Sequence, residues 1–182
     1  MKSIYILLTH SNTFISRLIR LATDDMYTHA SIAFDESLQP LYSFARKYVY
    51  IPLPAGLRVE TLINGFYKKD RYIPCALYEL EVEDEVYETA KREVENMMKN
   101  ATDYSFNVLG LILCRLGISW QRKYSYFCSE FVGEILMKSK ALSFTKHPSL
   151  MRPNDYTKFS QLQCCYEGNL TSLRRKFNIS YK

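Results

Sequence analysis

Short stretches of alternating or apolar residues mark the expected strands of this chain. Residues 4–8 form an apolar run that ends at polar residues, which is typical of a buried strand. Residues 29–35 alternate, so apolar and polar side chains should lie on opposite faces, and residues 41–47 should pair with them as a hairpin. Strand-forming residues also fill 75–82, and 161–168 are predicted as the last strand.

Helical spacing of apolar positions appears in four other stretches. Residues 13–23 carry apolar residues at helical spacing, with Asn12 or Thr13 as the expected cap. A second helix should begin at Asp84, and residues 107–118 are apolar enough to form a short buried helix. Residues 127–138 place Cys128 and several large apolar side chains on one helical face.

The order of these elements predicts an α+β fold. Residues 50–74 have no clear period, because Pro52 and Pro54 interrupt regular backbone pairing, and residues 146–159 are predicted as a loop. A length of 182 residues favours one domain, and no repeat or shift in composition divides residues 1–182.

Composition and charge exclude several classes of function. Apolar residues make up 47% of the chain and charged residues 24%, as in ordinary globular proteins. The net charge of +5 is spread among acidic residues, so we expect no nucleic-acid partner and at most a weak preference for anionic membrane surfaces. The start of the chain does not resemble a signal peptide and no apolar run is long enough to span a membrane, so a cytoplasmic protein is expected.

The five cysteines raise the question of chemistry. They form no CxxC pair, so we expect neither a zinc site nor another metal or cofactor. Free cysteines are usually buried and inert, which is the expectation for the other four: Cys75, Cys114, Cys164 and Cys165. Cys128 differs because it lies at the predicted start of a helix, where free amides and the macrodipole stabilise a thiolate.

A nucleophilic thiolate also needs a base, and three histidines are available. His10 and His147 are expected in loops, where solvent-exposed roles are the default. His29 begins the alternating strand of residues 29–35, where it is either a hydrogen-bonded edge residue or the base for Cys128. About 100 residues separate His29 from Cys128, which does not prevent contact, since such partners meet in space.

These segments resemble a known superfamily. The stretches "YTHASIAFDE", "LYSFARK", "YSFNVLGLIL", "YFCSEFVGEIL" and "HPSLMRPNDYTKF" occur in this order. Together they resemble the circularly permuted branch of the NlpC/P60 superfamily, which includes YiiX/YaeF-like and lecithin:retinol acyltransferase-like proteins. In that branch the histidine strand precedes the cysteine helix, as His29 precedes Cys128 here.

The resemblance implies a papain-like core, with an antiparallel sheet packed against helices and the nucleophile at a helix N-terminus. Cys128 would be the nucleophile and His29 the general base. A third polar residue, on the strand after the histidine strand, would orient the imidazole. Ser43 occupies that place, and Asp35 and Glu60 are alternatives. Substrates in the superfamily are mainly murein-type peptides, other amides and lipids.

Three further side chains near these segments have open roles. Tyr27 and Tyr126 each lie two residues before a catalytic candidate, so they are predicted as substrate contacts, although aromatic packing is the commoner role. Glu130 is expected to be solvated or to interact with the helix dipole in the first turn of the helix.

The sequence therefore predicts a cysteine peptidase or amidase that acts on a small peptide or lipid-like amide through an acyl-enzyme. A binding module with the same fold but no activity is the first alternative. The second is a lipid acyltransferase or amidase, which would have an exposed apolar patch near its groove. The oligomeric state stays open.

Overall fold

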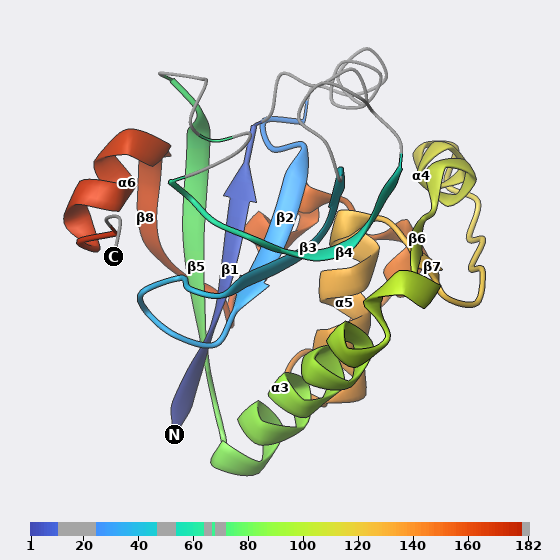
Figure 1. Cartoon of the computed structure of the whole chain (residues 1–182), viewed down its shortest axis with the longest axis horizontal. Helices are drawn as coiled ribbons and strands as arrows, with labels where there is room; N and C mark the ends of the chain where they lie inside the picture. Colours follow the sequence, from blue (N-terminus) through green and yellow to red (C-terminus); the bar gives the residue numbers. More distant parts are fainter. Residues whose placement is uncertain (11–24, 47–53, 64–66, 68–71, 180–182) are drawn as a thin grey trace.

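The computed structural model describes residues 1–10, 25–46, 54–63, 67 and 72–179. In this part of the chain, six strands form one antiparallel sheet in the order β4-β3-β2-β1-β5-β8 (Figure 1). The strands are β1 (Lys2–Thr9), β2 (His29–Ala33), β3 (Leu41–Arg46), β4 (Ala55–Glu60), β5 (Pro74–Val82) and β8 (Gln163–Asn169). A separate short parallel pair joins β6 (Ser105–Phe106) to β7 (Ser125–Tyr126).

Helices cover both faces of this sheet. Those described are α3 (Asp84–Lys99), α4 (Val108–Arg115), α5 (Cys128–Lys138) and α6 (Leu170–Lys176). Three 3-10 turns accompany them, η1 (Ala101–Asp103), η2 (Pro148–Leu150) and η3 (Pro153–Lys158). The helices α3 and α5 lie side by side against one face, and α6 lies beside β8 at the left edge of Figure 1.

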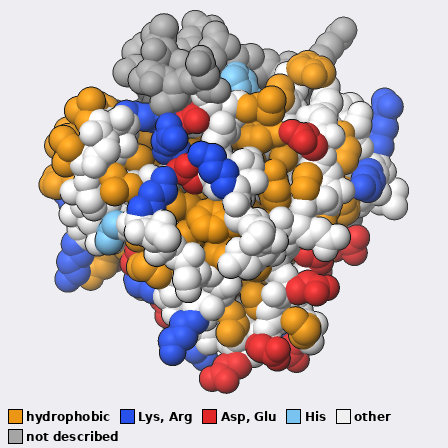
Figure 2. Space-filling model, turned by 180° about the vertical axis from the view of Figure 1, so that it is seen from behind, with side chains coloured by type: hydrophobic (Ala, Val, Ile, Leu, Met, Phe, Trp, Pro, Cys, Tyr) orange, Lys and Arg blue, Asp and Glu red, His pale blue; other side chains and the backbone are white. Residues whose placement is uncertain are grey.

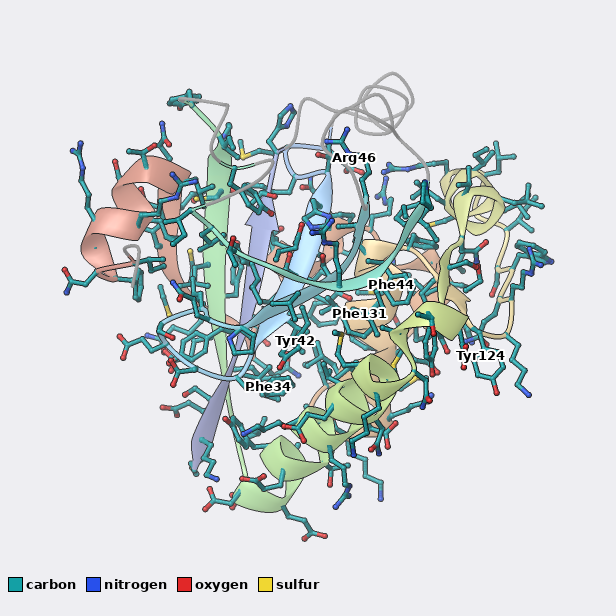
Figure 3. All side chains as sticks on the ribbon, in the orientation of Figure 1. Phe34, Tyr42, Phe44, Arg46, Tyr124 and Phe131 are labelled. Atoms are coloured by element: carbon teal, nitrogen blue, oxygen red, sulfur yellow. The ribbon has the colours of Figure 1, made fainter. Side chains whose placement is uncertain are left out.

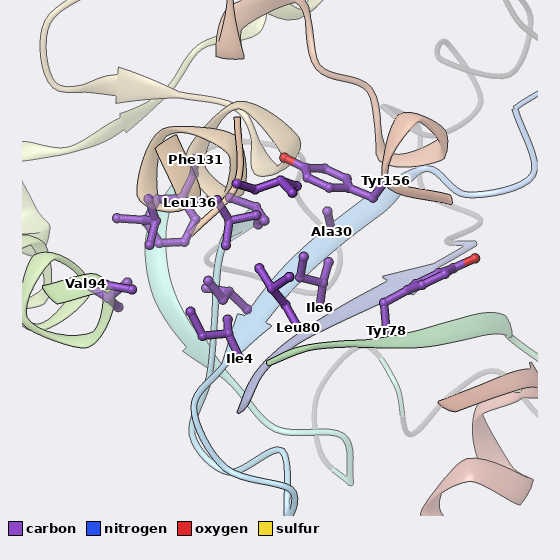
Figure 4. Close-up of a cluster of buried hydrophobic side chains, with 14 of the residues drawn as sticks. Ile4, Ile6, Ala30, Tyr78, Leu80, Val94, Phe131, Leu136 and Tyr156 are labelled. Carbon is purple, nitrogen blue, oxygen red and sulfur yellow. The ribbon is translucent and has the colours of Figure 1, made fainter. Parts of the chain in front are cut away.

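The main core fills the space between the sheet and the helices α3 and α5. Side chains of β1, β2 and β5 point toward α5 from the sheet, and Tyr156 closes the cluster from η3 (Figure 4). Phe44 of β3 and Phe131 of α5 meet with ring centroids 5.3 Å apart (Figure 3). Side chains of β1, β3 and β5 that point to the opposite face of the sheet form a second core with Leu170 and Leu173 of α6. Apolar burial on both faces therefore fixes the sheet between two layers.

Most of the predicted elements in the described region are confirmed. The strands at 4–8, 29–35, 41–47, 75–82 and 161–168 correspond to β1, β2, β3, β5 and β8, and β2 pairs with β3 as expected. The helix beginning at Asp84 is α3, and that of 127–138 is α5. The coarse class, α+β with an antiparallel sheet, is also confirmed.

Other expectations fail or lie outside the described residues. Strand β4 lies in a region where no element was predicted, and α6, which follows the last strand, was not predicted either. The helix predicted in 107–118 exists as α4, but it is not buried, since much of its apolar surface is exposed. The helix predicted for 13–23 lies outside the described residues.

Candidate active site

The thiol of Cys128 lies at the very start of a helix. Phe127 is the extended N-cap residue of α5, and Cys128 is its first helical residue. The fully buried Phe127 packs under α4, while Phe131 anchors α5 on the sheet. These contacts fix the first turn of α5 and place a 5% exposed thiol where helix amides converge.

His29 is the first residue of β2 and lies opposite Thr9 of β1. Its imidazole is hydrogen-bonded to the thiol of Cys128. On its other side, Nε2 lies 2.9 Å from Oε2 of Glu60. The three side chains form a relay of thiol, imidazole and carboxylate.

Two hydroxyl groups hold the carboxylate of Glu60 in place. Ser43 donates to Glu60 Oε2 at 2.7 Å, and Ser31 donates to the same oxygen at 3.0 Å. The Ser31 hydroxyl also lies 3.2 Å from His29 Nε2. With only 14% and 13% of the His29 and Glu60 side chains exposed, these hydrogen bonds replace those that water would make.

Strand register explains why these polar side chains meet. Leu41 of β3 lies opposite both Ala33 of β2 and Glu60 of β4, so the three share one face of the sheet. Residues two apart on a strand lie on the same face, which adds His29 from β2 and Ser43 from β3. Residues that are far apart in the sequence therefore form one polar cluster across three neighbouring strands.

Burial and charge act in opposite directions on this cluster. Burial alone would lower the pKa of His29, but the Glu60 charge and the hydrogen bonds to Cys128 and Glu60 raise it to about 10. Burial would raise the pKa of Glu60, but the charge and hydrogen bond of His29, with those from Ser43 and Ser31, lower it to about 2. Both shifts favour an imidazolium paired with a carboxylate at neutral pH.

The thiol responds to the same charges. Burial would raise the pKa of Cys128, but the hydrogen bond and charge of His29 outweigh it, and the backbone amides of Ala30 and Ser129 lower the pKa further. The pairing of β2 with β3 covers Ile32 and Ala33, so Ala30 lies outside that ladder. The net shift is downward, which favours a thiolate–imidazolium pair.

The proline-punctuated loop joins the two halves of the site. Asn154 accepts a hydrogen bond through Oδ1 from the amide of Tyr27 at 2.8 Å, just before β2. The buried hydroxyl of Tyr156 donates to the carbonyl of Ser129 at 2.7 Å, and the Ser129 hydroxyl donates to the carbonyl of Met151. The loop thus fixes the start of β2 relative to the first turn of α5.

The third residue of the relay differs from the prediction. Ser43 was expected to orient His29, but its hydroxyl donates to Glu60, and Glu60 makes the contact with the imidazole. A serine side chain is too short to span the distance from β3, whereas the longer Glu60 side chain reaches from β4. The alternative Asp35 lies in the turn at the far end of β2, where it accepts from the amide of Ser37.

The two tyrosines predicted to contact substrate have other partners. The hydroxyl of Tyr27 donates to Glu167 of β8 at 2.9 Å, and its ring lies in the main core. Tyr126 packs with Phe44 at 5.5 Å and lines a pocket of about 430 Å³, which also contains Lys138 at the opposite end of α5 from Cys128. Neither contact is with the Cys128–His29 pair, so their contact with substrate stays a prediction.

The structure also shows the surroundings of the two other histidines and of Glu130. His10 Nδ1 lies 2.7 Å from the carbonyl of Met26, and His147 accepts from the amide of Ser149. Of the two expectations for Glu130, solvation is wrong, because the residue is fully buried; it lies in the first turn of α5 and accepts from the amide of Phe127 at 3.2 Å. Burial raises its pKa to about 7, although that amide and Asn107 lower it.

The other four cysteines lack the environment of Cys128. Burial raises the pKa of Cys75 to about 12 and that of Cys114 to about 11. Burial and Glu79 raise the pKa of Cys165 to about 11. Cys164 is exposed on β8. Within the described residues, the lowered thiol pKa is specific to Cys128.

Sequence reasoning missed two supporting residues of the relay. Ser31 lies two positions after His29, so the alternation of β2 already placed both on one face. Tyr67 could not be found from the sequence. It is buried close enough to Glu60, Ser31 and Cys128 for all three to affect its pKa, which burial raises well above its ordinary value.

Among the described residues, no group of three or more metal-ligating side chains occurs, and no helix has the length and apolar character needed to cross a bilayer. No protein-family model matches the chain. A search of curated proteins gives no match either. The chemistry of the site therefore has to be inferred from its geometry.

Proposed function

We propose that this chain is a cysteine hydrolase of the peptidase or amidase class, built on a permuted papain-like core of the NlpC/P60 type. The observation that carries the proposal is the buried relay of Cys128, His29 and Glu60. Its support for catalysis is chemical, because a structural cysteine needs neither a paired imidazole nor a charged carboxylate behind it. The helix start and the strand order agree with such a core.

The proposed reaction proceeds in two steps. The Cys128 thiolate attacks the carbonyl carbon of an amide or ester, and the first-turn amides of α5 donate to the developing oxyanion. As the tetrahedral intermediate collapses, His29 gives its proton to the leaving amine or alcohol, and a thioester remains on Cys128. His29 then takes a proton from water, the hydroxide attacks the thioester, and the acid product leaves with the thiol restored.

Each partner of His29 has a distinct role in this scheme. Glu60 keeps the imidazole oriented and stabilises its charge, and Ser31 and Ser43 hold Glu60 in position. The case for a binding module without activity depended on an uncharged third residue. Glu60 supplies a charge there, so hydrolysis is the favoured function, with a murein-type peptide or another small amide as substrate.

The test is to trap the acyl-enzyme. The chain is incubated with a panel of activated esters, thioesters and murein-type peptides, and its intact mass and peptide masses are recorded. We expect an acyl adduct on Cys128 that hydroxylamine removes, and turnover that is lost in Cys128→Ala and His29→Ala. Cys164→Ala is the matched control, because Cys164 is exposed on β8 and should leave turnover intact. Turnover that persists in Cys128→Ala would sink the proposal.

A further inference from the structure

The outward face of α4, together with the turn that follows it, is an exposed stripe of large aliphatic side chains. Their exposed fractions lie between 39% and 68%, and the residues are Val108, Leu109, Ile112, Leu116 and Ile118. In Figure 1, α4 and the loop after it form the right-hand edge of the molecule, and the view from behind in Figure 2 has a hydrophobic patch at its left edge. A soluble surface seldom collects so many large aliphatic residues on one short helix and the turn after it.

The inner face of the same helix contacts the active-site helix. Leu111 and Cys114 of α4 form a small core with Phe127, the residue directly before Cys128. Asn107, the N-cap of α4, also lies close enough to Glu130 in the first turn of α5 to lower the pKa of that carboxyl group. Whatever binds the outer face of α4 therefore lies about one helix diameter, ~10 Å, from that turn.

A basic rim adjoins the apolar stripe. The turn η2 packs against α4. Lys146 precedes this turn and Arg152 follows it, and both pair with Asp155. Arg152 also pairs with Asp25. The carboxylates are covered, since the Asp25 and Asp155 side chains are 10% and 8% exposed. The basic partners lie outside them, with Arg152, Lys146 and Lys158 at 32%, 35% and 69%.

The segment that carries the stripe is positively charged, like the basic rim. Residues 104–129 contain no Asp or Glu, but they include Arg115, Arg122 and Lys123. Trp120, the one tryptophan of the chain, is partly exposed in the same loop. An apolar stripe edged by cations and an indole matches the boundary between lipid headgroups and acyl chains.

We propose that the α4 face docks on an anionic phospholipid bilayer, with α4 lying flat in the headgroup region and the basic rim contacting lipid phosphates. The cationic rim favours this partner, because an interface between two copies would bring the same basic side chains together. Docking holds the domain with the first turn of α5 near the membrane surface. It does not depend on catalysis, so vesicle binding tests it separately from the proposed hydrolysis.

The experiment is sedimentation of the purified full chain with vesicles. Mixed phosphatidylglycerol–phosphatidylcholine vesicles should retain the protein, and pure phosphatidylcholine vesicles should retain much less. Leu109→Asp/Leu116→Asp should lower the bound fraction by at least about tenfold, because two charges then enter the apolar layer. Met137→Asp is the matched control, since Met137 is a 39% exposed apolar residue at the far end of α5. Cys128→Ala should bind as the wild-type chain does.

Three results would overturn the proposal. One is equal retention on anionic and neutral vesicles, which would remove the role of the basic rim. A second is retention that the double aspartate variant leaves unchanged, with folding verified by circular dichroism. The third is a wild-type dimer that does not bind vesicles and that the double variant converts to a monomer, since a second copy would then cover α4.

Discussion

Replacing Glu60 with glutamine tests whether the charge of Glu60 keeps His29 protonated beside Cys128. Glutamine keeps the length of the side chain and one acceptor oxygen, but it removes the negative charge that lies 2.9 Å from Nε2. Loss of an opposite charge at this range typically shifts a pKa by about 1–3 units, or about 1.4–4 kcal/mol. The pKa of His29 should fall from about 10 by this amount, and that of the Cys128 thiol should rise.

The assay is the rate of Cys128 alkylation by iodoacetamide as a function of pH, followed by peptide mass spectrometry. Each rate is divided by its limiting value at high pH, which removes differences in access to the buried thiol. The Glu60→Gln midpoint should lie about 1–3 units above the wild-type midpoint. Ser43→Ala removes one hydrogen bond to Glu60, so its midpoint should move by less than about one unit. Glu167→Gln, which changes a carboxylate on β8, should not move it.

Two results would refute this reasoning. A folded Glu60→Gln variant whose profile coincides with that of the wild type would show that the charge does not act on the thiol. A wild-type midpoint at or above about 8.5 would show that the Cys128 thiol is not activated. Removing one partner of a buried pair can cost about 3–5 kcal/mol of stability, so folding is verified by circular dichroism. Ser43→Ala retains the charge and tests the same relay with less disturbance.

Three more variants test the frame around the site. Glu130→Gln should stabilise the fold at about pH 8 by up to about 3 kcal/mol and have little effect near pH 4, because a pKa raised to about 7 favours the neutral acid and stability falls as pH rises. Thermal melts at both pH values measure this, and equal shifts would contradict it. Tyr156→Phe loses the buried hydrogen bond to the carbonyl of Ser129 and should cost about 1–3 kcal/mol in urea unfolding; an unchanged midpoint would contradict that contact. Gly56→Ala puts a Cβ 2.8 Å from the carbonyl oxygen of Tyr104 and should destabilise by about 1–3 kcal/mol; a neutral effect would show that this approach is looser.

The elements that carry Cys128 and His29 were readable from the sequence because each has a clear local pattern. Alternation marks β2 with His29 at its start, and helical spacing marks α5 with Cys128 at its start. That these two residues meet does not follow from any local pattern. It depends on the packing of α5 across the sheet, which the family resemblance suggested and periodicity could not.

Glu60 was harder to select, because its role depends on pairing between distant segments. It ends β4, in a region where prolines obscure the strand, and a glutamate at the end of a strand usually faces water. Its burial follows from the pairing of β4 with β3, which a single sequence does not specify. The exposed face of α4 was misjudged for a related reason, since apolar composition predicts a helix but not which of its faces has a partner.

Glu60, the carboxylate of the relay, lies on the edge strand β4, so the close contact of Gly56 on the same strand also bears on the position of Glu60. A slip of β4 by one residue along β3 would turn Glu60 to the other face of the sheet and leave His29 without its counter-ion. The same slip would bring Ala55 or Leu57 to the place where the Tyr104 carbonyl leaves room for hydrogen alone. The close approach at Gly56 thus disfavours the slipped register, in which Glu60 could not contact His29.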